Sequence, residues 1–158
     1  NIKAVIFSNP CNPTSLGVKR EDVIKLIKNV YCLVIIDEAY MDFWDQSILD
    51  EVENYDNLII LKTCSKAIGL AGIRMGFAVA GETITTALRS VKSPYNTDSI
   101  SQAICKTVLR EKVFLKKCCE ELVESRKTLH DEVSALARKY VKLEKVYDSE
   151  TNFVFIKT

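Results

Sequence analysis

The sequence lacks long hydrophobic runs and any strong excess of charge of one sign. Its longest uninterrupted apolar stretches, such as residues 33–36, are far shorter than the roughly 20 residues that a membrane-spanning helix needs. The 22 basic and 21 acidic residues leave a formal net charge of +1, without a basic stripe dense enough for nucleic acid or a lipid surface. The first residues also lack the layout of a signal peptide. The composition therefore predicts no nucleic-acid or membrane partner and a soluble, cytoplasmic protein.

Histidine is scarce, because His130 is the only one in the chain. A single histidine offers no second imidazole for a metal site or a proton relay. The six cysteines lie within apolar periodic segments and lack the spacing of zinc ligands. They are Cys11, Cys32, Cys64, Cys105, Cys118 and Cys119. We therefore expect reduced, structural cysteines and no metal.

What the chain does have is enough apolar sequence for a core. Of its 158 residues, 47% are hydrophobic and 27% are charged, which excludes disorder and suits a folded domain. Apolar runs typical of buried strands lie at residues 3–8, 32–36, 58–61 and 76–81, and residues 18–30 have the spacing of an amphipathic helix. Strand, helix and strand in succession favour a parallel sheet covered by helices. The last of these strands follows too short a connection for a helical crossover, so we expect it to be antiparallel.

The second half of the sequence is mainly helical. Helical patterns cover residues 82–91, 98–109 and, in a long stripe, 113–140, and residues 152–156 form an expected strand. The predicted fold class is therefore α/β, with a three-layer, mostly parallel sheet flanked by helices and a long helix that leads to the first strand of a smaller domain.

The expected domain division follows from these elements. Residues 1–112 would belong to the large domain, 113–140 to the connecting helix and 141–158 to the start of a small C-terminal domain. Strands at both extremes give the impression of a chain cut at each end.

Polar side chains follow three of the predicted strands. Asn12 lies in a loop that two prolines stiffen, Asp37 directly follows a buried strand, and Lys66 follows the next. In parallel sheets, ligands lie beyond the carboxyl ends of the strands. We therefore expect these three side chains to face one crevice.

The surroundings of Lys66 suggest the chemistry of that crevice. A lysine amine becomes a covalent catalyst when it forms a Schiff base with a carbonyl group. The hydroxyls of Thr63 and Ser65 and the guanidinium of Arg74 are groups that bind phosphate. A cofactor with an aldehyde and a phosphate is needed, and pyridoxal phosphate has both. Asp37 could hold its ring nitrogen protonated, which makes the ring an electron sink, while Tyr40 and Asn12 could donate to its phenolic oxygen.

Three motifs then carry a resemblance to a known family. NPCNPT at residues 9–14, DEAYMDF at 37–43 and TCSK at 63–66, followed by GLAGIRMGF at 69–77, resemble the class I and II aminotransferases of the fold-type I pyridoxal-phosphate enzymes. Within that family the similarity is to histidinol-phosphate aminotransferases and the related threonine-phosphate decarboxylases. The motifs occur in family order, and the resemblance covers essentially the whole chain.

The resemblance implies an activity and a set of roles. It implies transamination between an amino acid or amino-phosphate donor and a 2-oxo acid acceptor, in a homodimer with pyridoxal phosphate. Lys66 would carry the cofactor and move protons, with Asp37 and Tyr40 beside it as catalytic groups, while Asn12, Thr63, Ser65 and Arg74 would bind the cofactor. A decarboxylase-like lyase remains an alternative, because both classes share this scaffold.

The sequence also departs from the family pattern. Family members commonly have glycine at the position of Ser15 and often asparagine at that of Cys11. The amino-terminal third of the family, with its ring-stacking aromatic residue, and the carboxy-terminal domain, with its carboxylate-binding arginine, are not represented. We therefore expect this chain by itself to be inactive.

Structural interpretations stand beside the functional ones. Asp37 could cap a helix, Tyr40 could fill core space and Asn12 could form a turn. Ser65 could be a spacer beside the lysine, and the stripe at 113–140 could be core or a domain connection. A non-catalytic phosphate-binding α/β module is a further alternative, but the sequence has neither glycine-rich phosphate motif that such a module would use.

Overall fold

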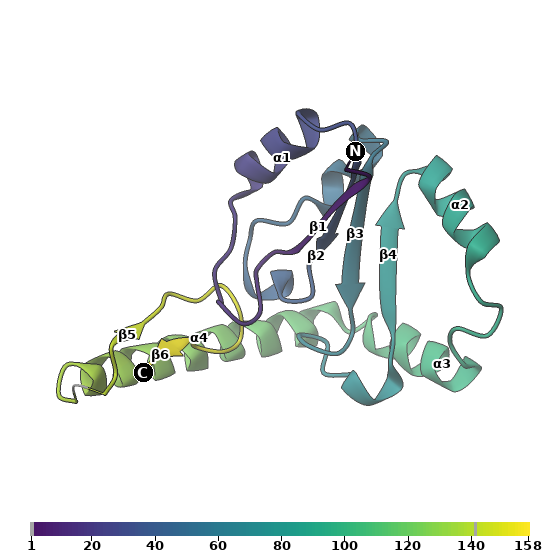
Figure 1. Ribbon diagram of the computed structural model, residues 1–158. Helices are drawn as coiled ribbons and strands as arrows, with labels where there is room; N and C mark the ends of the chain where they lie inside the picture. Colours follow the sequence, from purple (N-terminus) through teal and green to yellow (C-terminus); the bar gives the residue numbers. More distant parts are fainter. Residues whose placement is uncertain (1, 141) are drawn as a thin grey trace.

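A mixed four-stranded sheet organises the molecule. The computed structural model describes residues 2–140 and 142–158. Strands β1 (Ala4–Ser8), β2 (Leu33–Asp37), β3 (Leu58–Thr63) and β4 (Gly76–Ala80) lie side by side in the order β1-β2-β3-β4 (Figure 1). The first three are parallel and β4 is antiparallel to β3, as the short connection predicts. All four predicted strands are confirmed within two residues at either end.

Helix α1 (Arg20–Lys28) covers one face of this sheet. Its apolar positions Val23 and Ile27, one helical turn apart, are both 2% exposed. They pack against alternate residues of the two central strands, because side chains on a strand point to the same face at every second position. The core cluster consists of Val23, Ile27, Val34, Ile36, Ile48, Leu58 and Ile60. The sequence pattern of residues 18–30 predicts this helix correctly.

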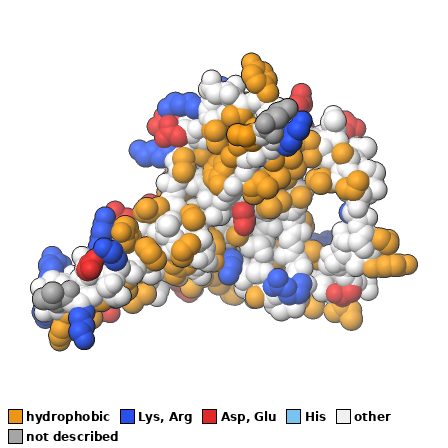
Figure 2. All heavy atoms as spheres, viewed as in Figure 1, with side chains coloured by type: hydrophobic (Ala, Val, Ile, Leu, Met, Phe, Trp, Pro, Cys, Tyr) orange, Lys and Arg blue, Asp and Glu red, His pale blue; other side chains and the backbone are white. Residues whose placement is uncertain are grey.

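The sheet also carries hydrophobic side chains that the described residues leave open to solvent. Ile6 of β1 is 68% exposed, although the residue that pairs with it in β2 is the apolar Ile35. Figure 2 shows hydrophobic side chains gathered over the sheet. Helices α2 (Glu82–Val91) and α3 (Ser99–Val108) follow β4 as predicted, and α3 begins at an N-cap, Asp98, whose carboxylate accepts a hydrogen bond from the Ser101 amide at 2.8 Å.

The long helix α4 (Lys112–Ala137) crosses near the carboxyl ends of the parallel strands (Figure 1). It begins and ends close to the predicted range 113–140, although residues 138–140 lie beyond its end. None of its residues, all within the described part, is fully buried, and Leu122, Leu129 and Leu136 of the predicted stripe are each more than 40% exposed. The part that packs on the fold is Cys119 and Val123, which contact the cluster around Tyr40.

The C-terminal segment differs from the sequence prediction. A strand was expected over residues 152–156, but the only strand pairing near the end joins β5 (Lys145–Val146) to β6 (Ile156–Lys157) in antiparallel register. The cause is local, because the hydroxyls of Ser149 and Thr151 bond to the backbone of Phe153 and take the place of a ladder. Among the described residues, no helix is both long and apolar enough to cross a membrane.

Candidate active site

The loop after β1 is held rigidly by one buried asparagine. Asn9 is 2% exposed, and its side chain bonds to Val18 twice, accepting from the backbone N–H at 2.7 Å and donating to the carbonyl at 2.9 Å. Its own backbone N–H donates to the carbonyl of Asp37 at 2.9 Å. The start of the loop is thus bonded both to Val18 at the end of the loop and to Asp37 at the end of the neighbouring strand. These bonds fix where Asn12 lies.

Asn12 and Tyr40 are joined by a hydrogen bond. The Asn12 side-chain amide donates to the Tyr40 hydroxyl at 3.0 Å. Tyr40 is only 7% exposed, whereas Asn12 is exposed, so the pair lies at the boundary between the core and solvent. An amide and a hydroxyl that follow the ends of different strands are therefore within hydrogen-bond distance of each other.

Lys66 lies on the other side of the Tyr40 ring. Its Nζ is 5.3 Å from the ring centroid, a distance at which an ammonium group is attracted to the aromatic face. The loop that carries Lys66 closes through hydrogen bonds from Gly69 N to Lys66 O at 3.0 Å and from Leu70 N to Cys64 O at 2.8 Å. Gly69 has φ +74°, which favours glycine at this tight turn. The lysine side chain itself is exposed.

The two consecutive acids after β2 have different environments. Glu38 is 1% exposed, and its carboxylate accepts hydrogen bonds from Ser47 Oγ at 2.7 Å and from the Ile48 amide at 3.1 Å. Asp37 is only partly buried, and one of its carboxylate oxygens accepts from the Ala39 amide at 3.0 Å. Glu38 is therefore committed to holding the loop, whereas Asp37 keeps one oxygen available at the strand end. The choice of Asp37 as the site acid agrees with this difference.

The expected phosphate ligands are brought near one another only in part. Thr63 Oγ1 accepts from the backbone N–H of Ser65 at 3.1 Å, which orders the turn before Lys66. Arg74 is exposed, has φ +53°, and its guanidinium donates to the carbonyl of Ala71 at 3.1 Å. A bond from Cys64 N to Met75 O at 3.0 Å holds the residue after Arg74 beside the lysine loop. The backbone thus positions Arg74 for the site, while its side chain is turned onto its own loop.

A pair of buried thiols lies directly behind the lysine loop. The sulfur atoms of Cys64 and Cys105 are 3.4 Å apart, and the two residues are 1% and 3% exposed. Burial raises the pKa of the Cys64 thiol to about 12, and the neighbouring Cys105 adds to the shift. All six cysteines, which lie within the described residues, are free, as the sequence analysis expects.

Phe153 is the contact of the site that the sequence analysis did not assign. Its ring meets the Tyr40 ring edge to face, with centroids 5.4 Å apart and planes at 84°. The two residues are distant in sequence, so no local pattern indicates their contact.

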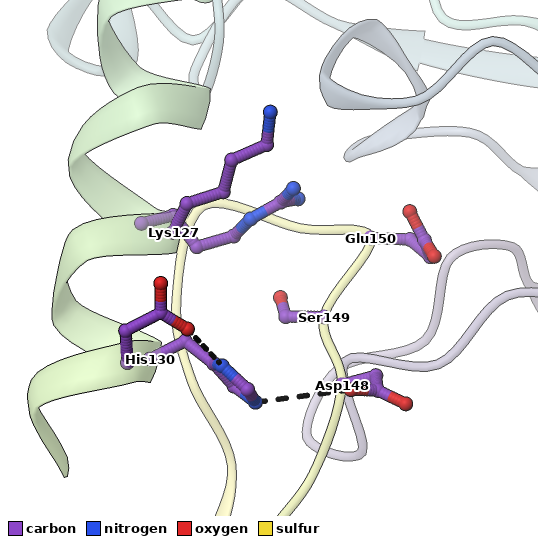
Figure 3. A pocket seen from close by; sticks show the side chains of 7 residues that line it. Lys127, His130, Asp148, Ser149 and Glu150 are labelled. Carbon is purple, nitrogen blue, oxygen red and sulfur yellow. Dashed lines mark hydrogen bonds and ion pairs between the residues drawn. The ribbon is translucent and has the colours of Figure 1, made fainter. Parts of the chain in front are cut away.

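The segment before Phe153 borders a polar hollow of about 440 Å³ against α4. Figure 3 shows side chains of α4 facing Asp148, Ser149 and Glu150 of this segment. His130 lies 3.3 Å from Asp131 and 3.8 Å from Asp148, measured from ring nitrogen to carboxylate oxygen. The lining contains none of the predicted site residues. It is Arg126, Lys127, His130, Asp131, Asp148, Ser149 and Glu150.

Fold and site together define a class of protein. It is an α/β protein in which a lysine, an aspartate, a tyrosine and an asparagine follow the carboxyl ends of neighbouring strands, where ligands of such sheets lie. The particular family follows from comparison with known proteins. The model of the family "aminotransferase class I and II" matches residues 1–158, and this chain belongs to that family.

Similar proteins give the comparison more detail. The chain is 43% identical over 154 residues to the histidinol-phosphate aminotransferase of Clostridium novyi (strain NT), an alignment that covers 98% of this chain and 42% of that protein. It is 45% identical over 155 residues to the enzyme of the same name from Thermoanaerobacter sp. (strain X514), again with 98% of this chain and 42% of that protein covered. The chain thus spans less than half the length of these curated relatives.

Solved structures agree on the fold. Histidinol-phosphate aminotransferase from Sinorhizobium meliloti, in complex with pyridoxal-5'-phosphate, superposes with a TM-score of 0.86 at 24% identity, covering 97% of this chain and 41% of that one. L-threonine-O-3-phosphate decarboxylase from Porphyromonas gingivalis superposes with a TM-score of 0.82 at 19% identity, covering 96% and 46%. At these identities the likeness establishes the fold, which both classes of enzyme share.

Proposed function

We propose that the protein containing this chain is a pyridoxal-phosphate-dependent aminotransferase that acts on histidinol phosphate or a similar amino-phosphate, in histidine biosynthesis. It would transfer the amino group of the donor to a 2-oxo acid. The observation that carries the proposal is that Asn12 and Lys66 both lie near Tyr40 beyond the strand ends, with Asp37 at the end of strand β2. The identity of 43–45% to enzymes of that name supports the choice of substrate.

The donor set suits the cofactor. Pyridoxal phosphate supplies an electron-withdrawing ring that stabilises negative charge at the substrate α-carbon. Asn12 Nδ2 and the Tyr40 hydroxyl lie 3.0 Å apart, close enough for both groups to donate to a single phenolic oxygen. The free oxygen of Asp37 suits a protonated ring nitrogen, and the exposed amine of Lys66 is accessible to an aldehyde. The residues present therefore fit the group.

Each side chain has a task in this proposal. Lys66 would hold the cofactor through its amine and would move a proton at the substrate α-carbon. Asp37 keeps the ring nitrogen protonated, while Tyr40 and Asn12 donate to the phenolic oxygen. Thr63, Ser65 and Arg74 bind the phosphate, for which the Arg74 guanidinium must leave the Ala71 carbonyl.

The test uses the full-length protein that contains this chain. Purified with pyridoxal phosphate and treated with borohydride, it should give a visible absorption band before reduction and a peptide with the cofactor attached to Lys66 after it. Lys66→Ala should give neither, whereas Lys62→Ala, which removes a lysine paired with Asp42 at 2.9 Å, should keep the adduct on Lys66. An adduct that persists in Lys66→Ala contradicts the assignment.

A substrate panel separates the two activities that share this fold. Histidinol phosphate with 2-oxoglutarate should yield glutamate, and threonine phosphate should release no carbon dioxide. Carbon dioxide from threonine phosphate without amino transfer would support the lyase, whose solved relative from P. gingivalis has the same fold.

Assembly, domain division and compartment belong to the same proposal. A homodimer is supported by exposed hydrophobic side chains such as Ile100 at 71%, Val113 at 86% and Phe114 at 63%.

Residues 1–112 would form part of the large domain, 113–140 the connection and 141–158 the start of the small domain. The six free thiols support the cytoplasm, where thiols stay reduced. Sedimentation of the full-length protein tests the dimer, and a monomer would contradict it.

A further inference from the structure

Tyr40 is held from a part of the chain that contains none of the predicted site residues. Its ring is 7% exposed, and Phe153, from the segment after α4, packs its edge against it at 84°. Edge-to-face packing is directional, because the positive edge of one ring meets the negative face of the other. The contact therefore restrains the orientation of the Tyr40 ring, and with it the direction in which the hydroxyl points.

Phe153 is itself fixed by polar contacts. Ser149 Oγ donates to the Phe153 carbonyl at 2.6 Å, and the Phe153 amide donates to Thr151 Oγ1 at 3.4 Å. From α4, Arg126 Nη1 donates to the carbonyl of Thr151 at 2.8 Å. Thr151 is 0% exposed, so these bonds are shielded from water. The position of the Phe153 ring is thus set by side chains of its own segment and of the long helix.

The same segment is bonded to the loop that carries Asn12. Ser15 Oγ donates to the carbonyl of Asp148 at 2.9 Å, and the Glu150 amide donates to the carbonyl of Ser15 at 2.8 Å. Figure 3 shows residues 148–150 running between α4 and the rest of the chain. The segment therefore contacts Tyr40 through Phe153 and contacts the loop that carries Asn12 through Ser15.

We propose that Phe153 is a positioning residue that aims the Tyr40 hydroxyl, so that the segment 148–153 controls how strongly Tyr40 and Asn12 act on the phenolic oxygen of the cofactor. The proposal rests on the function proposed above and deepens it. Phe153 touches neither cofactor nor reacting atoms, and acts only through Tyr40. Any movement of this segment would be transmitted to the electronic environment of the bound cofactor.

The direction of the effect follows from the chemistry of the phenolic oxygen. When Tyr40 and Asn12 donate to it, they compete with the proton on the nitrogen that joins Lys66 to the cofactor. A weaker Tyr40 hydrogen bond leaves more negative charge on the oxygen, which holds that proton to higher pH. The midpoint of the pH titration of the visible band should therefore rise when Phe153 is replaced by leucine.

The experiment compares two phenylalanines in the same segment. Phe153→Leu removes the ring against Tyr40, whereas Phe155→Leu removes a ring that packs on Tyr147 with centroids 5.2 Å apart. In the full-length protein with cofactor, Phe153→Leu should raise the titration midpoint by about half a pH unit and lower kcat about five-fold, the size expected for a weakened hydrogen bond. Phe155→Leu should change neither, and Phe153→Tyr, which keeps the ring, should restore the native midpoint.

A second measurement does not depend on the cofactor. In the cofactor-free protein, the Asn12 side-chain amide gives an NMR signal whose position reports its bond to Tyr40, and Tyr40→Phe defines its position without that bond. Phe153→Leu should move the signal toward that of Tyr40→Phe. If it stays at the native position, or if Phe155→Leu moves it equally, Phe153 does not position Tyr40. If no visible band forms in the native protein, the proposed function fails, while the amide signal still decides the role of Phe153.

Discussion

Ser15 offers a test of the backbone geometry that joins the first site loop to the C-terminal segment. It is 0% exposed, has φ +62°, and donates a hydrogen bond to the Asp148 carbonyl at 2.9 Å. A positive φ favours glycine over alanine by about 1 kcal/mol, and a hydrogen bond of this kind contributes about 1 kcal/mol. The hydroxyl of Ser15 therefore compensates for the cost of its backbone conformation.

Two substitutions separate these contributions. Ser15→Ala loses the hydrogen bond and keeps the unfavourable φ, so it should lower the free energy of unfolding by about 1 kcal/mol. Ser15→Gly loses the same bond but relieves the backbone, so its stability should stay within about 0.5 kcal/mol of native. The glycine variant should therefore be the more stable of the two.

The assay is urea unfolding of the full-length protein, followed by circular dichroism. Ser90, an exposed residue within α2, is the matched control, because glycine in a helix is less stable than alanine by up to about 1 kcal/mol. Ser90→Ala should be more stable than Ser90→Gly, the reverse of the order at Ser15. If alanine is at least as stable as glycine at Ser15, the positive φ there is refuted.

Three further outcomes follow from the site and its surroundings. Asp37→Ala should keep the cofactor bound through Lys66 but lose most turnover, because the ring nitrogen loses the carboxylate that keeps it protonated; turnover equal to native would remove Asp37 from the mechanism. Under brief alkylation at mildly alkaline pH, mass spectrometry should find Cys11 modified before Cys64. Hydrogen bonds from Ser8 and Thr14 lower the pKa of the Cys11 thiol, whereas burial raises the pKa of the Cys64 thiol to about 12. Equal rates of modification would contradict both environments. Burial raises the pKa of Glu150, so its neutral form favours the fold, and this contribution is present at low pH and lost as pH rises through the folded-state pKa. Glu150→Gln should therefore increase stability at neutral pH relative to native, with the gain vanishing in acid, whereas a gain that is independent of pH would point to a different cause.

The strands could be predicted because fully buried parallel strands are continuous hydrophobic runs, whereas their order in the sheet is known from the structure. Val34 and Ile36 of β2 are both 0% exposed. A short, fully apolar run between helical segments is typical of a buried parallel strand. The rule that ligands lie at the carboxyl ends of such strands then places Asn12 and Asp37 together without any knowledge of the family. In the structure the Asn12 side-chain amide lies 3.0 Å from the Tyr40 hydroxyl.

The parts that could not be predicted depend on contacts between distant residues. Phe153 packs on Tyr40 across most of the chain, and nothing in the residues around either one indicates the other. The strand expected at 152–156 is a local exception, because it is replaced by short-range hydroxyl bonds from Ser149 and Thr151 that its apolar pattern does not indicate. The different environments of Asp37 and Glu38 likewise follow from Ser47, whose position the local pattern does not determine.

The order of the strands has a consequence for how the protein folds during synthesis. Because β1, β2, β3 and β4 neighbour one another in the order in which they are made, each strand leaving the ribosome can pair with the one before it. The loop that carries Lys66 lies between the last two of them, so the sheet and Lys66 can be in place early. Tyr40, however, lacks its Phe153 contact until the segment after α4 has been translated. The nascent chain therefore has Lys66 in place before the Tyr40 ring beside it is packed against Phe153.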